Sequence, residues 1–378
     1  MSKCLRSGLF LVGVLLISSS LLPALSGAEQ KPSWQEEWEK TVSAAKREGK
    51  LGIFLYQRDN IEAAVKAFEK RYPEIQVNTV ATPAADTGPR LMAERRAEKY
   101  LWDICICGPT TPYSVLYAAK ALDPIEPAFI LPEVLDESKW WGGKHHYMDP
   151  EGKYIFVFLG TVEMPNVYYN TSLVRANELK SFADLLHPKW KGKIVVMDPR
   201  QPGRQRVSAR VLYYIPELGA KFLQRFFTEM DVTLSREDRQ ALDWLAVGKF
   251  SLCVFCGRVF YAKAQGLPVD EFSTSTWVKT PAIYSGSNGT LTLLNKAPHP
   301  NAAKVFINWL LSREGQIAFQ KIMNSPDITM ESMRTDIPKE PVAPEDRRVE
   351  GVNYIIMDTP ERSDQAPVGK LLKEVIQK

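Results

Sequence analysis

Short apolar runs alternate with amphipathic helical stretches along the first third of the chain, and this alternation constrains the fold most. The runs at 51–56, 75–80 and 102–108 have the length and apolar character of buried strands. Between them, 61–72 and 90–100 carry apolar residues at helical spacing. Strand, helix, strand, helix, strand predicts an α/β fold, in which a parallel sheet is covered by helices on both faces. Such sheets bind ligands at the carboxyl ends of their strands.

A second α/β unit is expected further along the chain. Strands are predicted at 166–173, 193–199 and 251–256, followed by a returning strand at 290–295 and a long helix at 301–323. A chain of 378 residues is too long for a single core, so two domains are expected.

The first 28 residues have the features of a secretory signal peptide. Lys3 and Arg6 precede an apolar run, and small residues then lead to Ala28. The apolar run is shorter than the ~20 residues that a membrane span needs. No cysteine follows it before Glu29, so a lipid anchor is not expected, and a periplasmic location is predicted. An uncleaved anchor is the alternative.

Four cysteines form two close pairs, Cys105 with Cys107 and Cys253 with Cys256, each flanked by apolar residues. We favour buried free thiols. A disulfide is the alternative in an oxidising compartment, and a four-thiol zinc site is a further one. Cys105 and Cys107 fit a chelating turn poorly, because residues two apart on a strand point to the same face.

Adjacent histidines, His145 and His146, follow two tryptophans, Trp140 and Trp141. Neighbouring residues on a strand point to opposite faces, so this pair is poorly placed to hold one metal ion. We interpret the segment as a loop packed by the tryptophans.

Four phrases of the sequence carry a resemblance to a known family. They are "IEAAVKAFEKRYPEIQV", "RLMAERRAEKYLWDI", "YNTSLV…SFADLLHPKWKGKIVVMDP" and "LNKAPHPNAAKVFINWLLSREGQ". Together they resemble the substrate-binding proteins of ABC importers, nearest to the ferric-ion-binding branch of the type II periplasmic binding proteins. The resemblance covers most of residues 48–325. It implies two α/β lobes joined by crossing hinge strands, with the ligand cleft between them. Lobe 1 would combine 29–165 with 285–378, and lobe 2 would be 166–284.

The sequence departs from the family at the iron site. The resemblance implies that ferric members hold iron with two adjacent tyrosines after the strand that matches 251–256. Here that segment contains Arg258, Phe260 and Tyr261, while the adjacent Tyr213 and Tyr214 lie within the preceding helix. Because a ferric ion prefers anionic oxygen ligands, an arginine in this segment disfavours iron.

Four arginines and a single acid occupy residues 198–210, "DPRQPGRQRVSAR", where a predicted strand leads into a predicted helix. An arginine fork binds carboxylate, phosphate or sulfonate through two parallel hydrogen bonds, and a helix N-terminus also favours anions. Arg206 and Arg210 are four apart and are expected to face solvent. The alternative is that the arginines pair with acids, face water or contact the membrane subunits of an importer.

We therefore predict an extracytoplasmic solute-binding component of an ABC transporter that captures a small anion by hinge closure and delivers it to the permease. A ferric-ion or ferric-chelate carrier is the alternative, and a ligand-presenting subunit of a membrane sensor is a second one.

The chain contains four histidines and neither a G-x-S-x-G nor an H-E-x-x-H motif, so no catalytic residue is expected. No resident cofactor or metal is expected either. The net charge of +4 does not favour a nucleic-acid partner, and a monomer is expected. The predicted ligand-binding residues are Arg58, Thr110, Thr111, Arg200, Gln201, Arg204, Arg258, Ser287 and Asn288.

Overall fold

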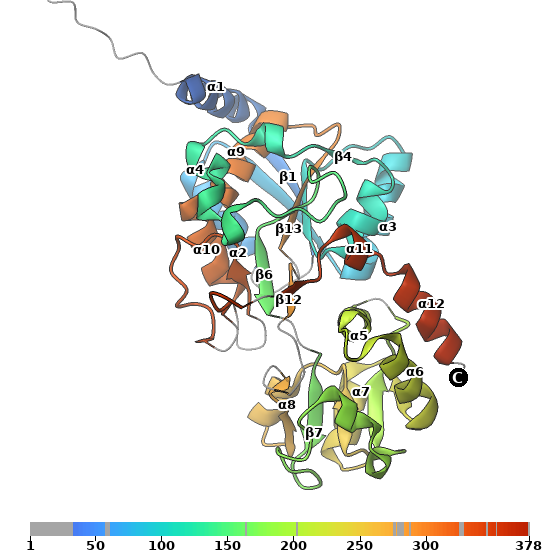
Figure 1. Ribbon diagram of the computed structural model, residues 1–378. Coiled ribbons are helices and arrows are strands. Elements are labelled where there is room, and N and C mark those ends of the chain that lie inside the picture. The colour runs from blue at the N-terminus through green and yellow to red at the C-terminus, as the bar shows by residue number, and fades with distance from the viewer. Residues whose placement is uncertain are drawn as a thin grey trace, which may run out of the picture.

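Two lobes, each with its own apolar core, lie one above the other in Figure 1. Within the described ranges, no helix has both the length and the apolar character to cross a membrane. The computed structural model describes residues 33–56, 61–162, 165–201, 203–274, 277, 283–286, 289–324, 329–344, 347–352 and 354–376.

Lobe 1 is built on a mixed sheet whose strand order is β2-β1-β3-β13-β4, with β5 also paired to β13. The three strands predicted from the alternating pattern pair in parallel, with β1 in the middle, which confirms the α/β prediction. The returning strand β13 runs antiparallel to β3. The strands are β1 (Lys50–Tyr56), β2 (Gln76–Thr82), β3 (Ile104–Cys107), β4 (Leu122–Asp123), β5 (Phe156–Val157) and β13 (Thr290–Leu294).

The helices of lobe 1 bury apolar stripes against this sheet and against one another. Phe68 of α2, for example, packs edge-to-face on Phe306 and Trp309 of α9, and all three side chains are buried. Such burial of apolar surface is the main stabilising contribution to the lobe. The helices are α1 (Ser33–Glu48), α2 (Ile61–Arg71), α3 (Ala84–Arg96), the π-helical turn η1 (Pro112–Tyr117), α4 (Pro132–Leu135), α9 (Pro300–Leu311) and α10 (Arg313–Met323).

Lobe 2 has a second sheet, of order β11-β7-β10-β8-β9, in which β8 is parallel to both β10 and β9. Its elements occupy the lower part of Figure 1. The strands are β7 (Val167–Asn170), β8 (Ile194–Met197), β9 (Thr233–Ser235), β10 (Leu252–Val254) and β11 (Val269–Glu271). The helices are α5 (Arg204–Tyr214), α6 (Gly219–Glu229), α7 (Asp238–Ala246) and α8 (Val259–Ala264).

A small third sheet lies between the lobes and contains the crossing strands, in the order β14-β6-β12-β15. The chain leaves lobe 1 after β6 (Leu159–Val162) and returns through β12 (Ile283–Ser285). These strands are antiparallel neighbours, with Tyr284 opposite Val162. The outer strands are β14 (Glu331–Ser332) and β15 (Ile355–Ile356).

The last helix differs from the expected division of the chain. After α11 (Pro360–Ser363), the helix α12 (Ala366–Val375) lies beside α5 and α6 of lobe 2. Val368, Leu372 and Ile376 are buried in the second core. The expected division places all of 285–378 in lobe 1. The polar pattern of this segment does not indicate which core it joins, so its packing on lobe 2 could not be predicted.

Candidate functional site

The lobe 1 side of the predicted site is described in part. Arg58, Ser287 and Asn288 lie outside the described residues. Thr110 and Thr111 follow the carboxyl end of β3, where Thr111 is buried and precedes the π-helical turn η1. Thr110 is exposed, and its Oγ1 accepts a hydrogen bond of 2.8 Å from Gln365 Nε2. This contact links lobe 1 to the segment that packs on lobe 2.

Arg200 is already paired within the protein. Its Nε and Nη2 each donate to the carboxylate of Asp198 at 2.9 Å, and its Nη1 donates to the Ile376 carbonyl oxygen at 3.1 Å. Burial raises the pKa of Asp198, but the hydrogen bonds from Arg200 outweigh this effect and hold it below its usual value. Half-buried Gln201 donates its backbone N–H to the Asp198 carbonyl oxygen. The fork of Arg200 thus stabilises the turn.

Arg206 and Arg210 were expected to face solvent, and this expectation is wrong. Arg206 is half-buried and donates to the carbonyl oxygens of Pro199 and Arg200. Arg210 is 1% exposed and donates through Nη1 to the Arg362 carbonyl oxygen at 3.1 Å. Spacing along a helix showed that the two share a face, but not that a distant segment of the chain covers that face.

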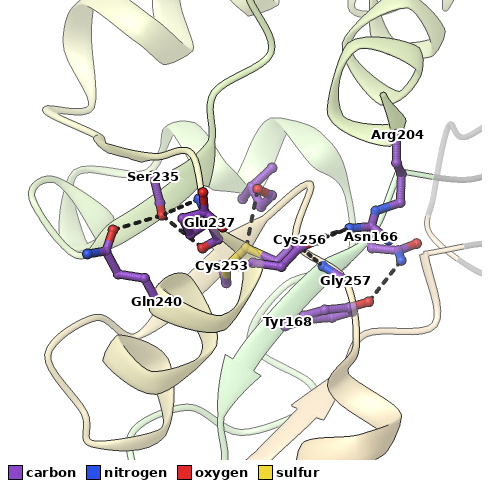
Figure 2. The surroundings of a disulfide bond; sticks show 11 residues. Asn166, Tyr168, Arg204, Ser235, Glu237, Gln240, Cys253, Cys256 and Gly257 are labelled. Atoms are coloured by element: carbon purple, nitrogen blue, oxygen red, sulfur yellow. Dashed lines mark hydrogen bonds and ion pairs between the residues drawn. A yellow bond between two sulfur atoms is a disulfide. The ribbon is translucent and has the colours of Figure 1, made fainter. Parts of the chain in front are cut away.

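Arg204, in the first turn of α5, belongs to a polar cluster at the carboxyl end of β10. Its Nη2 donates to both carboxylate oxygens of Asp238, at 3.0 and 2.9 Å. The same carboxylate accepts the backbone N–H of Gly257 at 2.9 Å. The guanidinium lies so close to Gly257 that a Cβ there would collide with it. Figure 2 shows Arg204 and Gly257 beside Asn166, whose side chain donates to the hydroxyl of buried Tyr168.

Arg258 heads α8 in a left-handed conformation, with φ of +66°. Its side chain is exposed and makes no ion pair or hydrogen bond within the part of the chain that the structure describes. Phe255 is also left-handed, with φ of +64°. Such a conformation costs a non-glycine residue about 1–2 kcal/mol, so the surrounding structure must hold this turn in place.

One covalent restraint on the turn is a disulfide between Cys253 and Cys256, which Figure 2 shows together with the neighbouring Gly257. For this pair the favoured interpretation, free thiols, is wrong and the disulfide alternative is confirmed. Cys105 and Cys107 are free and buried, as predicted. Burial raises the pKa of the Cys107 thiol, which keeps it protonated.

Two aromatic side chains extend the exposed surface next to Arg258. Phe260 is 45% exposed and Tyr261 is 50% exposed on α8. The adjacent tyrosines of α5 lie elsewhere, and the hydroxyl of Tyr214 donates to the Glu361 carbonyl oxygen at 3.1 Å. No group of three or more His, Cys, Asp or Glu side chains that could hold a metal ion occurs among the described residues.

The adjacent histidines have structural roles, as predicted. His145 Nε2 hydrogen-bonds the Val134 carbonyl oxygen, and its ring packs edge-on against Trp140. His146 stacks on Trp141, and burial lowers its pKa to about 4. The His146 ring is therefore neutral at physiological pH.

The polar cluster contains one residue that the sequence analysis did not identify. Asp238 opens an ordinary amphipathic helix, and its position relative to Arg204 depends on three strands pairing in the right order. An acidic residue in the first turn of a helix is common, so no signal distinguished it.

Comparison with known proteins gives one family and a set of solved structures. The family described as bacterial extracellular solute-binding proteins matches residues 63–246, just under half of the chain. A search of the curated proteins gave no match.

Three solved structures illustrate the shared fold. Iron-bound HitA from Pseudomonas aeruginosa is 18% identical, with a TM-score of 0.58 over 86% of this chain and 99% of HitA. Trichodesmium FutA in complex with iron and citrate is 17% identical, with a TM-score of 0.62 over 87% of this chain and 100% of that one. AfuA from Actinobacillus pleuropneumoniae with bound fructose-6-phosphate is 17% identical, with a TM-score of 0.59 over 87% and 98%. At these identities the structures show the fold, which is that of the type II periplasmic binding proteins.

Proposed function

We propose that this chain, an extracellular solute-binding protein, captures a small anion between its two lobes and delivers it to the membrane subunits of an ABC importer. Binding would occur where the carboxyl ends of strands from both lobes face the crossing strands. Closure of the lobes about β6 and β12 would then enclose the ligand.

The observation that carries the anion proposal is the state of Arg258. Among the predicted arginines of lobe 2, Arg200 is paired with Asp198 and Arg204 with Asp238. Arg258 is exposed at the carboxyl end of β10 and has no acidic partner in the described ranges. Its strained backbone is held by a disulfide-bridged turn, and such strain is maintained most often at functional sites. A free guanidinium at this position suits a carboxylate, phosphate or sulfonate.

Two further groups support the assignment. Arg204 is 42% exposed despite its ion pair, and its guanidinium lies against Gly257. An anion bound within reach of Arg258 would therefore also be attracted by the charge of Arg204. Thr110 supplies an exposed hydroxyl at the facing end of β3 in lobe 1. We infer that Arg258 provides most of the charge recognition and that the other groups orient the ligand.

A ferric chelate is the second candidate. The exposed phenol of Tyr261 lies three residues after Arg258, and one of the similar structures holds iron together with citrate. A phenolate beside an arginine could accept a metal ion and its carboxylate chelator together. This candidate needs the same arginine and is distinguished by its requirement for the metal.

The location and partners follow from this role. We propose that the protein is exported by cleavage of residues 1–28, acts in the periplasm as a monomer, and carries out no catalytic step. A membrane sensor is the alternative recipient of the liganded form.

Calorimetric titration of the chain lacking residues 1–28 tests the proposal, with inorganic phosphate, citrate, fructose-6-phosphate and ferric citrate as probes. We expect at least one anion to bind, and Arg258→Ala to weaken that binding about tenfold or more. Arg225→Ala is the matched control, because Arg225 is an exposed arginine of α6 paired with Glu229. Unchanged affinity in Arg258→Ala would overturn the assignment. If ferric citrate binds and metal-free citrate does not, the iron alternative is selected.

A further inference from the structure

Residues 354–376, here named the strap, run from the crossing strands to the outer surface of lobe 2. At one end, β15 pairs in parallel with the crossing strand β12. At the other end, α12 packs on α6 and contributes Val368 and Leu372 to the second core. Figure 1 shows α11 near the crossing strands and α12 beside α5 and α6. The strap is thus a third connection between the lobes.

The arginine-rich turn and α5 hold the lobe 2 side of the strap. Arg200 Nη1 donates to the Ile376 carbonyl oxygen, and Arg210 Nη1 donates to that of Arg362, both at 3.1 Å. Tyr214 adds a hydrogen bond to the Glu361 carbonyl oxygen. Charge-assisted hydrogen bonds to the backbone fix the path of a segment without depending on its side chains.

Two contacts hold the strap at the other side. The carboxylate of Asp358 accepts the backbone N–H of Gly286, which directly follows β12. Gln365 donates to the hydroxyl of Thr110 at the carboxyl end of β3, at 2.8 Å. A movement of lobe 2 away from lobe 1 would stretch the chain between these contacts and α12.

The buried residues Arg210 and Asp358 face each other across the junction between lobe 2 and the crossing strands. Their side chains are 1% and 2% exposed, and Nη2 lies 3.9 Å from Oδ1. Neither atom has a hydrogen-bond partner among the described residues, and nor do Arg210 Nε and Ser363 Oγ. Buried unpaired polar atoms are costly, and a direct charge-assisted bond would need a separation about 1 Å shorter.

We propose that the strap limits the opening of the two lobes, with Asp358 and Gln365 as positioning residues that bias the protein toward closure. Asp358 acts through its attraction to Arg210 and its bond to the crossing segment at Gly286. Gln365 acts through Thr110. The inference shares with the proposed function only the movement of the lobes, and it is testable without any ligand.

The test is a double electron–electron resonance measurement of the distance between two spin labels, one in each lobe of the unliganded protein. In the chain lacking residues 1–28, Leu101→Cys in lobe 1 and Val247→Cys in lobe 2 are suitable label sites, because these side chains are 51% and 79% exposed and the four cysteines that remain are buried. The measurement is made in the otherwise native chain and in Asp358→Asn, Gln365→Ala and Tyr214→Phe. Tyr214→Phe is the matched control, because it removes a contact between lobe 2 and the strap while α12 still anchors the strap in the second core.

We expect Asp358→Asn and Gln365→Ala to move the distance distribution toward longer separations, with the open–closed equilibrium shifted about fivefold for each lost hydrogen bond or charge contact. Tyr214→Phe should leave the distribution unchanged. Native distributions in both Asp358→Asn and Gln365→Ala would overturn the proposal. Should Asp358→Asn fail to fold, the Gln365→Ala variant, which changes a half-buried side chain, decides the outcome alone. If the native protein bound none of the anion probes in calorimetry, this would count against the proposed function and not against the strap.

Discussion

Arg204 and Asp238 form an ion pair that also fixes the turn after β10, because the Asp238 carboxylate accepts both the guanidinium of Arg204 and the backbone N–H of Gly257. One carboxylate therefore connects α5, α7 and the segment that carries Arg258. The pair is partly exposed, at 42% and 28%, so solvent screens much of its attraction. We infer that its main contribution is to position the turn.

Replacing Asp238 with alanine should loosen the turn with little effect on stability. We expect amide exchange at Gly257 to rise several-fold, because its N–H loses its acceptor, while the free energy of unfolding falls by no more than about 1 kcal/mol. Hydrogen exchange with mass spectrometry measures the first and urea unfolding the second. Glu229→Ala, which breaks the exposed pair with Arg225, is the control and should leave Gly257 unchanged. Equal exchange at Gly257 in native protein and Asp238→Ala would refute a positioning role.

The disulfide should stabilise the same turn. Closing a loop as short as Cys253–Cys256 contributes about 2 kcal/mol in the chain-entropy treatment. We expect the Cys253→Ala/Cys256→Ala variant to lose about this much stability and to show faster amide exchange near Arg258. A thiol count in denaturant, on the chain without residues 1–28, should give two thiols. Four thiols in non-reduced protein would contradict the disulfide.

A buried ion-pair cluster beside the crossing strands should make stability depend on pH. Glu331 is 1% exposed; burial raises its pKa, but Arg348 and Lys339 outweigh this and hold it below its usual value. A lowered folded-state pKa contributes stability that is present above the unfolded-state value of about 4.3 and is lost as pH falls through the folded-state value.

Replacing Glu331 with glutamine should therefore cost about 3 kcal/mol at pH 7, because Arg348 is left buried without its partner. The difference from native protein should shrink below about pH 4, where the native carboxylate becomes protonated. Urea unfolding between pH 3 and pH 8 measures both effects. A difference that stays constant over this range would show that the charge of Glu331 is not the cause.

The crossing strands are packed too closely to accept a larger residue at Gly160. A Cβ at this position of β6 would collide with the ring of buried Tyr284 in β12. We expect Gly160→Ala to lower stability by about 1–3 kcal/mol through overpacking. The loss should be smaller when Tyr284 is replaced by leucine, which makes room for the methyl group. A double-mutant cycle on thermal unfolding would show no coupling if the two residues were not in contact.

The sequence predicted the parallel strands because their apolar runs are continuous and are separated by clear helical periods. The hydrogen-bond partners of the site residues could not be predicted in the same way. Arg200 and Arg210 show why: their charge and their place near a helix start are visible in the sequence, yet their partners, Ile376 and Arg362, are more than 150 residues away. Pairing over that distance depends on how the strap packs on lobe 2.

Arg258 illustrates the opposite case. Its position after an apolar strand identified it as a candidate from local sequence alone. Its left-handed backbone and the neighbouring disulfide depend on the turn geometry, which four residues of sequence do not specify. The structure also accounts for the charge of residues 198–210, because three of those four arginines bond to backbone or acid groups of the turn and the strap.

Thermal unfolding of the chain lacking residues 1–28, in the presence of phosphate, citrate, fructose-6-phosphate, ferric citrate or a polyamine, tests the central claim most directly. A ligand that binds only the folded state stabilises it by about 2.7 kcal/mol at 100 times its Kd. We predict a rise in melting temperature with at least one anion, and none with the polyamine. A rise with the polyamine alone, or with none of these solutes, would contradict the proposal of an anion-binding protein.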